Sequence, residues 1–285
     1  MTGEPITVLA HAKINLFLRV LRRREDGYHE IESLISPISL ADELRVRPAE
    51  RLRVEVGGRD APTLGGLNLA LVAALALADT CPDAGGALVE IDKRIPVAAG
   101  LGGGSADAAA TLRALNDLWG CDVDGSALAD IAERIGSDVP VMLRDQPMLV
   151  GGRGETLSSV EVATFHWALV RFGFGVRSPD AYRWWDLEGA KTGPDTASVL
   201  TAAAAGDAEA LGAALFNDLE APVFARHPEV GAAKQRLLEA GALGAVMSGS
   251  GSSVLGLARD AEHARELADA FEDAEPVVSP ASKAG

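Results

Sequence analysis

A glycine-rich segment near the middle of the chain has the composition of a phosphate-binding loop. Four of the five residues 100–104 are glycine, Ser105 follows them, and helix-forming residues continue over 106–119. Glycines let the backbone approach an anion closely, and the free N–H groups at the beginning of a helix favour negative charge. Successive glycines also lose much backbone entropy on folding, which argues against a purely structural loop. The segment therefore predicts a phosphate site.

Three familiar phosphate loops are excluded by the residues around these glycines. A Walker loop needs a lysine after its last glycine, but Ser105 follows Gly104. A dinucleotide loop needs G-x-G-x-x-G, and counting from Gly100 the sixth residue is Ser105. A protein-kinase loop needs H-R-D and D-F-G segments, and the chain has neither. The remaining distinctive pattern is Pro96 followed by a glycine–serine loop.

Two charged residues have the chemistry of acid–base catalysis. Asp138, in G-S-D-V-P-V at residues 136–141, is expected in a loop just before a strand, where its carboxylate could act as a base. A turn or helix-terminal aspartate is the alternative. Lys13 is one of only five lysines among 26 basic residues, which indicates that a compact ammonium group is required there. A solvated lysine on a strand is the alternative.

The elements that must position these residues alternate between strands and helices, as in an α+β protein. The first half predicts strands at 6–10, 14–21, 44–46, 52–56 and 87–91, with helices at 67–78 and 106–119. Asn68 is a candidate N-cap. The second half predicts strands at 168–172, 242–247 and 253–258, with helices at 196–205, 208–216, 229–240 and 261–271. Residues 151–154 are the best candidate for a joint between domains, although a loop within one domain fits equally well.

Composition excludes several classes of function. Hydrophobic residues make up 48% and charged residues 24%, as in a folded globular protein, and the net charge of −15 argues against nucleic acid or an anionic membrane as partner. The longest apolar run, 69–78, is far shorter than the roughly 20 residues of a membrane span. Cys81 and Cys121 cannot make a disulfide framework or a zinc site alone, and the histidines lack metal-ligand spacing. With no leader sequence, we expect a cytoplasmic protein with reduced cysteines.

Three segments together resemble the GHMP kinase superfamily of small-molecule kinases. They are A-K-I-N-L-F-L at 12–18, the loop with its P-x-x-x-G-L-G pattern at 96–105, and M-S-G-S-G-S-S at 247–253. The first and third are weak alone, but their order along the chain is specific. With D-G-Y-H at 26–29 and G-S-D-V-P-V at 136–141, the chain is similar to the branch that acts on 4-diphosphocytidyl-2-C-methyl-D-erythritol in the methylerythritol phosphate isoprenoid pathway.

This resemblance implies a fold and an activity. It implies a two-domain α+β fold, with a ribosomal-protein-S5-like domain over 1–152 that binds ATP and a ferredoxin-like domain over 153–285, whose last strand can return to the first domain. The activity is transfer of the ATP γ-phosphate, with Mg²⁺, to the 2-hydroxyl of a cytidine-diphosphate-linked methylerythritol, by a monomer or homodimer. Another GHMP kinase, acting on homoserine, mevalonate or a sugar, is the first alternative. A non-catalytic nucleotide-binding module is the second, and it would be expected to lack Lys13 or Asp138.

The resemblance also implies roles for individual residues. Asp138 becomes the base, with Lys13 holding it ionised. Tyr28 and Tyr182 would stack on cytosine, while His29 would form hydrogen bonds with the edge of the base. For Tyr28 and His29, ordinary half-burial at the beginning of a strand is the alternative. The implied substrate contacts are Asn15, Tyr28, His29, Tyr182 and Gly249. The implied ATP contacts are Asn68, Lys93, Ile95, Pro96, Gly100, Leu101, Gly102, Gly103, Gly104, Ser105 and Ala106.

Two consequences concern charge. Asp107 stands where members of the family often carry an amide, which places a carboxylate near the phosphate loop. Because both substrates are polyphosphates and the protein is acidic, the site is expected to be locally positive. The candidate cations are Lys13, Lys93, Arg94 and the arginine run at 22–24. The sequence does not indicate which residues bind the metal.

Overall fold

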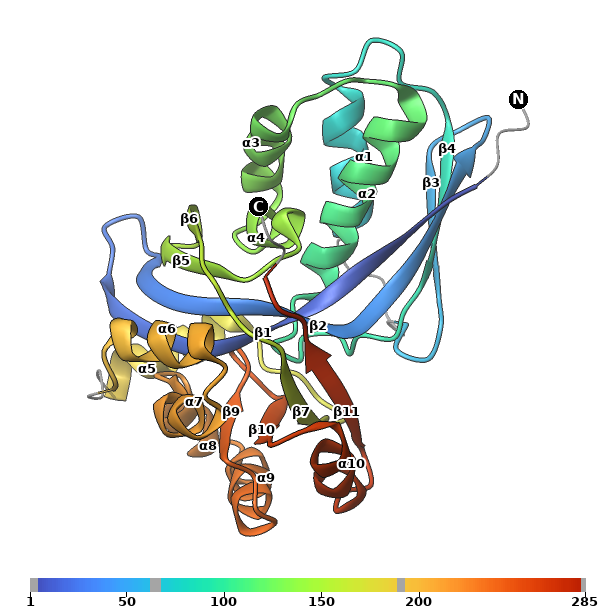
Figure 1. Cartoon of the computed structure of the whole chain (residues 1–285). Helices are drawn as coiled ribbons and strands as arrows, with labels where there is room; N and C mark the ends of the chain where they lie inside the picture. Colours follow the sequence, from blue (N-terminus) through green and yellow to red (C-terminus); the bar gives the residue numbers. More distant parts are fainter. Residues whose placement is uncertain (1–4, 62–67, 189–192, 283–285) are drawn as a thin grey trace. The chain divides into compact units, whose positions relative to one another are not determined.

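The computed structural model describes residues 5–61, 68–188 and 193–282, which form two compact units built from interleaved segments (Figure 1). The first unit comprises Met1–Ala12, Leu40–Val97 and Gly102–Asp145, and the second comprises Lys13–Ser39, Ala98–Leu101 and Gln146–Gly285. Two long strands, β1 (Ile6–Arg23) and β2 (His29–Pro48), contribute residues to both units. The domain division expected at residues 152 and 153 stays a prediction.

The described part of the first unit combines a small sheet with four helices. Strand β3 (Arg53–Gly57) runs parallel to β4 (Ala87–Asp92), and β4 is antiparallel to the end of β2, with Val46 opposite Val89. The helices are α1 (Leu69–Ala78), α2 (Gly103–Trp119), α3 (Gly125–Ile135) and α4 (Val139–Arg144). Figure 1 shows α1 and α2 packed side by side. Alanines on their buried faces allow this close approach.

Local signals place the beginning of α1 correctly. The side chain of Asn68 accepts hydrogen bonds from the backbone N–H groups of Ala70 and Leu71, at 2.9 and 3.4 Å, so the predicted N-cap is confirmed. The segment after Asp138, however, is the helix α4 and not the predicted strand. Pro140 stands in the first turn of α4, where a missing N–H group does no harm. A short apolar segment with a proline near its beginning occurs both in strands and in the first turns of helices. The sequence of residues 139–143 therefore does not distinguish a strand from a helix.

Cys81 and Cys121 form a disulfide, which corrects the expectation of reduced cysteines. They are 40 residues apart in sequence, with Cα atoms 5.3 Å apart. Cys81 follows the end of α1, and Cys121 follows Gly120, the C-cap of α2. The bond therefore ties the C-terminal ends of two packed helices, and a closed loop of this length stabilises a fold by roughly 2–4 kcal/mol. Cysteine spacing alone could not show that the two helices end together.

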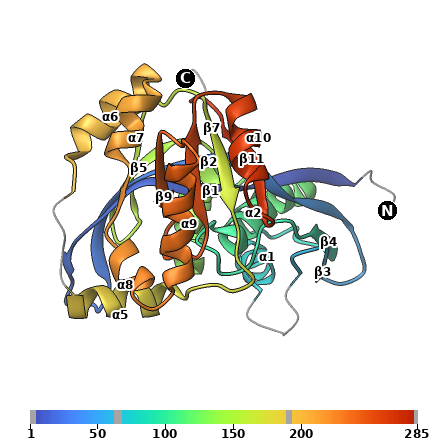
Figure 2. The same cartoon turned by 90° about the horizontal axis from the view of Figure 1, so that it is seen from below.

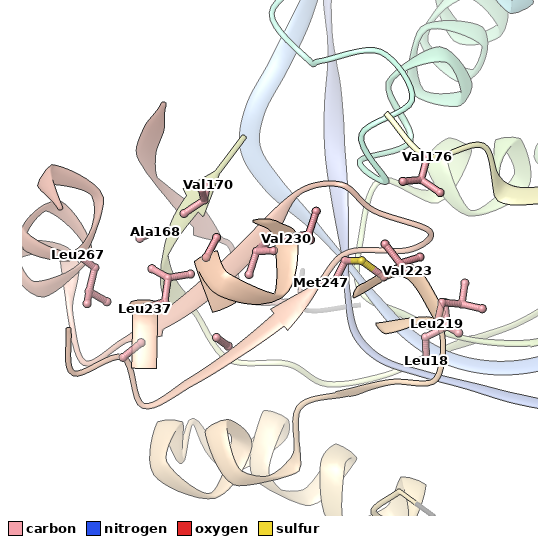
Figure 3. Close-up of a cluster of buried hydrophobic side chains, with 14 of the residues drawn as sticks. Leu18, Ala168, Val170, Val176, Leu219, Val223, Val230, Leu237, Met247 and Leu267 are labelled. Atoms are coloured by element: carbon pink, nitrogen blue, oxygen red, sulfur yellow. The ribbon is translucent and has the colours of Figure 1, made fainter. Parts of the chain in front are cut away.

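The core of the second unit lies between a four-stranded antiparallel sheet and two helices. The strand order is β11 (Ala274–Ser279), β7 (Phe165–Val170), β10 (Val254–Ala258) and β9 (Gly244–Met247). Helices α9 (Pro228–Glu239) and α10 (Ala261–Asp269) lie beside these strands (Figure 2). Leu237 of α9 and Leu267 of α10 join Ala168 and Val170 of β7 in one buried cluster (Figure 3). Side chains of alternating strand positions form this face, as pleating requires.

The remaining elements of the second unit surround the ends of β1 and β2 that belong to it. Strand β5 (Met148–Gly152) pairs antiparallel with residues 31–35 of β2 and with β6 (Thr156–Ser159). Residues 151–154, the candidate joint, thus lie in the β5–β6 hairpin. The helix predicted over 208–216 stops earlier, because Phe216 and Asn217 form β8, parallel to β1. The helices here are α5 (Ser178–Glu188), α6 (Thr196–Ala205), α7 (Ala208–Ala214) and α8 (Glu220–Phe224).

No helix among residues 5–61, 68–188 and 193–282 is both long and apolar enough to cross a membrane.

Candidate active site

The glycine-rich loop leads into an N-terminus of α2 that lacks a side-chain cap. Gly102, at the N-cap, has a left-handed φ of 70° that favours glycine, and within the described part of the chain no side-chain capping hydrogen bond is made at this end of the helix. The first N–H groups of a helix need an acceptor, and a phosphate oxygen is a suitable one. At Gly104 a Cβ atom would meet only Leu69 Cδ1, at 3.7 Å. The first turn of α2 therefore fits an anion.

Gly103 has a different reason to be glycine. A Cβ atom there would lie 2.9 Å from Ile95 Cγ2 and 3.2 Å from Lys93 Nζ. The glycine therefore lets α2 pack directly on the segment that carries two of the predicted ATP contacts. A larger side chain at Gly103 would therefore displace Ile95. A substitution at Gly104 has more space, so its effect on phosphate binding would be easier to separate from an effect on packing.

Lys93 is held in a buried cluster with two carboxylates. Its ammonium group donates to Asp42 Oδ2 at 2.5 Å and to Asp107 Oδ2 at 2.8 Å. The other oxygen of Asp42 accepts from the backbone N–H groups of Arg94 and Ile95, at 2.6 and 2.9 Å. Asp42 is fully buried, and the other two are nearly so. The cluster thus fixes both the lysine and the backbone that follows it beneath the beginning of α2.

The charges of this cluster shift its ionisation. Burial raises the pKa of Asp107 from 3.8 to about 7; the charge of Lys93 opposes this shift, and the like charge of Asp42 adds to it. Burial alone would lower the pKa of Lys93, but the negative charges of Asp107 and Asp42 outweigh burial and raise it above 10.5. Lys93 therefore stays charged, and Asp107 is the group that titrates near neutral pH.

The stability of the protein should therefore depend on the charge of Asp107. The unfolded chain releases this proton near pH 3.8 and the folded chain near pH 7, so the folded state binds more protons between these values and its stability falls as pH rises. The variant Asp107→Asn cannot ionise. We expect its free energy of unfolding to decline less than the parent's between pH 4 and pH 7.5, measured by urea denaturation. Parallel profiles for the two proteins would contradict the shift.

In the second unit, residues from three predicted motifs converge around Lys13. Its ammonium group donates to Asn15 Oδ1 at 2.6 Å, and Asn15 Nδ2 donates to Ser33 Oγ at 2.8 Å. A Cβ atom on Gly249 would lie 3.0 Å from Lys13 Nζ and 3.1 Å from the carbonyl oxygen of Gly100. The structure thus brings together one predicted catalytic residue, two predicted substrate contacts and the first residue of the glycine-rich loop.

A second group of predicted substrate contacts gathers where β2 begins. The rings of His29 and Tyr182 stack, with centroids 4.8 Å apart and planes 19° apart. Tyr28 is half exposed, and the guanidinium of Arg153 lies 5.1 Å from its ring centroid. The two tyrosines therefore differ in their immediate neighbours, and the predicted stacking of cytosine between them stays a prediction.

Asp138 is the N-cap residue of α4, yet its side chain makes no capping hydrogen bond. It is half-buried and belongs to the first unit, whereas Lys13 belongs to the second. The alternative of a helix-terminal aspartate fits this position, so both interpretations of Asp138 stay open. The predicted roles of Asp138 as the base and of Lys13 as its partner stay predictions.

Most of the expected cations do not supply unbalanced positive charge. Arg94 lies 2.8 Å from Asp92, Arg22 lies 2.5 Å from Glu30, and Arg24 lies 3.1 Å from Asp26. Arg23 Nη1 is 3.5 Å from Asp186, and Lys93 is shared by two carboxylates. These pairs show which carboxylates accompany the expected cations, and the expectation of a locally positive site stays a prediction.

Sequence reasoning missed two residues of these groups, Asp42 and Asp186. Asp42 was detectable in principle, since it stands between alternating apolar residues of a strand where a buried charge needs a partner. Asp186 Oδ1 lies 2.7 Å from His29 Nε2, a contact between residues 157 positions apart. No local pattern marks it. Within the described residues, no group of three or more His, Cys, Asp or Glu side chains could hold a metal ion.

Comparison with known proteins defines the class of this fold and loop. The sequence matches the family model of the GHMP kinases N terminal domain over residues 68–152 and that of the GHMP kinases C terminal over 199–276. The structure of a homoserine kinase from Cytophaga hutchinsonii aligns with 100% of this chain and 97% of that chain, with a TM-score of 0.72 and 20% identity. That likeness shows the fold alone. The predicted α+β fold with two GHMP domains is confirmed.

More similar proteins identify the branch. Proteins named 4-diphosphocytidyl-2-C-methyl-D-erythritol kinase from Symbiobacterium thermophilum and Pelotomaculum thermopropionicum are 46% and 44% identical, over 88% and 92% of this chain and 90% and 92% of theirs. A crystal structure of 4-(cytidine 5'-diphospho)-2C-methyl-D-erythritol kinase aligns with 98% of this chain and 100% of that chain, with a TM-score of 0.83 and 36% identity. The chain belongs to the 4-diphosphocytidyl-2-C-methyl-D-erythritol kinase family, which confirms the resemblance seen in the motifs.

Proposed function

We propose that this protein transfers the γ-phosphate of ATP to the 2-hydroxyl of 4-diphosphocytidyl-2-C-methyl-D-erythritol, as an enzyme of isoprenoid biosynthesis. The observation that carries the proposal is the convergence of Lys13, Asn15, Gly100 and Gly249, from three motifs that the sequence shares with this branch of the GHMP kinases. Identity of up to 46% with relatives named for this activity supports it. Homoserine and mevalonate kinases resemble the chain at 20% identity or less, which supports no more than a shared fold.

In this proposal the protein contributes positioning and proton transfer, and ATP supplies the phosphoryl group. Asp138 accepts the proton of the acceptor hydroxyl. As this proton leaves, the hydroxyl oxygen bonds to the γ-phosphorus of ATP, and the bond between the γ-phosphorus and the oxygen that departs with ADP breaks. Lys13, the second catalytic residue implied by the motifs, helps to position the acceptor alcohol. The N–H groups at the beginning of α2 bind phosphate oxygens, and Asn68, Lys93 and Ile95 lie on the adenosine side.

The proposal includes Mg²⁺ as the partner of ATP. Magnesium keeps several waters and is commonly carried on nucleotide phosphates with only one or two protein carboxylates, so it needs no dedicated cluster of acidic residues. A cytoplasmic location and a monomeric or homodimeric state also stay predictions. The disulfide between Cys81 and Cys121 is of a kind more common in oxidising compartments.

A coupled assay of ADP release tests the function. ADP should form rapidly when ATP, Mg²⁺ and the cytidine-diphosphate alcohol are all present, and phosphorus NMR should show a new phosphomonoester on that alcohol. Homoserine, mevalonate and galactose serve as control acceptors, because they are alcohols that carry no nucleobase. Faster phosphorylation of any of these would contradict the proposal and favour another GHMP kinase activity. Binding of ATP with no turnover of any acceptor would favour a nucleotide-binding module.

A further inference from the structure

One helix of the second unit surrounds the imidazole of His29 with three side chains. Tyr182 stacks on its face, and Trp185 meets it edge-on with centroids 5.7 Å apart and planes at 86°. Asp186 Oδ1 lies 2.7 Å from its Nε2 atom. These residues stand at positions i, i+3 and i+4 of α5, so they share one face of the helix. The His29 side chain is only 8% exposed as a result.

The carboxylate determines which ring nitrogen carries the proton. An ionised carboxylate only accepts hydrogen bonds, so Nε2 must donate, and in a neutral imidazole Nδ1 then has a lone pair. The second oxygen of the same carboxylate, Oδ2, lies 3.5 Å from the guanidinium of Arg23. Within the described residues, Nδ1 has no hydrogen-bond partner and is not a fully buried atom. It remains available to a ligand as an acceptor.

We infer that Asp186 is a positioning residue that holds His29 with Nδ1 as an acceptor for the 4-amino group of cytosine. The inference rests on the proposed function, which supplies the cytidine ligand. An acceptor at this point attracts the amino group of cytosine and repels the 4-carbonyl oxygen of uracil. Asp186 therefore acts on the choice between bases through the histidine, without touching the substrate.

Calorimetric titration of each variant with cytidine diphosphate and uridine diphosphate tests this role. Excess Mg²⁺ and ADP are present throughout, so that the nucleotide loop of α2 is occupied. The parent should prefer the cytidine ligand. In Asp186→Asn, an amide can present either oxygen or nitrogen to Nε2, so the preference should fall roughly tenfold, mainly through weaker binding of the cytidine ligand. Asp186→Glu, which keeps an acceptor, should retain a larger preference than Asp186→Asn.

Asp180→Ala is the matched control, because Asp180 is also on α5 but pairs with Arg183 at 2.9 Å. It should keep the parent's preference. An unchanged ratio of affinities in folded Asp186→Asn, or a parent that does not distinguish the two bases, would overturn the inference even if the enzyme phosphorylates the cytidine-diphosphate alcohol. Absence of that phosphorylation in the parent would instead count against the proposed function. Melting temperatures, measured for every variant, exclude loss of folding as the cause.

Discussion

Replacing Asp138 with asparagine is expected to lower turnover by about 10²–10⁴-fold, the usual effect of removing a general base. The amide has nearly the same shape but cannot accept the proton of the attacking hydroxyl. Because the Asp138 side chain makes no capping hydrogen bond, α4 should lose little stability. ATP and the acceptor should bind with near-parental affinity. The measurement is the steady-state rate of ADP release at saturating concentrations of both substrates.

Asp124→Asn is the matched control for this variant. Asp124 is the N-cap of α3 in the same unit, where its side chain accepts from Ser126 and Ala127, and asparagine caps helices equally well. Turnover of the control should match that of the parent. If Asp138→Asn folds normally and turns over within about threefold of the parent, Asp138 is not the base and another group must accept the proton.

Replacing Asp42 with alanine is expected to destabilise the protein by about 3–5 kcal/mol, as when one partner of a buried ion pair is removed. Lys93 would keep only Asp107 as a partner, and the backbone N–H groups of Arg94 and Ile95 would lose their acceptor. The free energy of unfolding, measured by urea denaturation, gives the effect directly. Because this cluster lies beneath the beginning of α2, affinity for ATP should fall as well.

The neighbouring residue provides the control. Glu43 pairs with Arg45 and Arg94 near the surface, where an ion pair contributes about 1 kcal/mol or less. Glu43→Ala should therefore unfold at nearly the parental urea concentration. Equal destabilisation by the two substitutions would show that the buried cluster does not stabilise the fold more than a surface pair does.

Local features of the sequence determined most of the helices and strands and the position of the glycine-rich loop. The glycines around the beginning of α2, the N-cap Asn68 and the periodic apolar residues of most helices and strands act on neighbours a few positions away, so they can be recognised without the fold. The order of the three motifs also identified the GHMP kinases, since such a series of spaced residues recurs within a family. Where local preference was ambiguous, as after Asp138, the predicted strand proved to be a helix.

The tertiary structure alone decided which distant residues became partners. Asp42 and Lys93 are 51 positions apart, and His29 and Asp186 are 157 apart, so no periodicity relates them. The tertiary structure also decided which charged side chains are buried and which opposite charges lie beside them, whereas the sequence gives only their number. Lys93 was counted among the candidate cations of a locally positive site, and folding pairs its ammonium group with the carboxylates of Asp42 and Asp107. A charge in a low-dielectric interior must be compensated nearby, and the compensating group is chosen by how the chain packs.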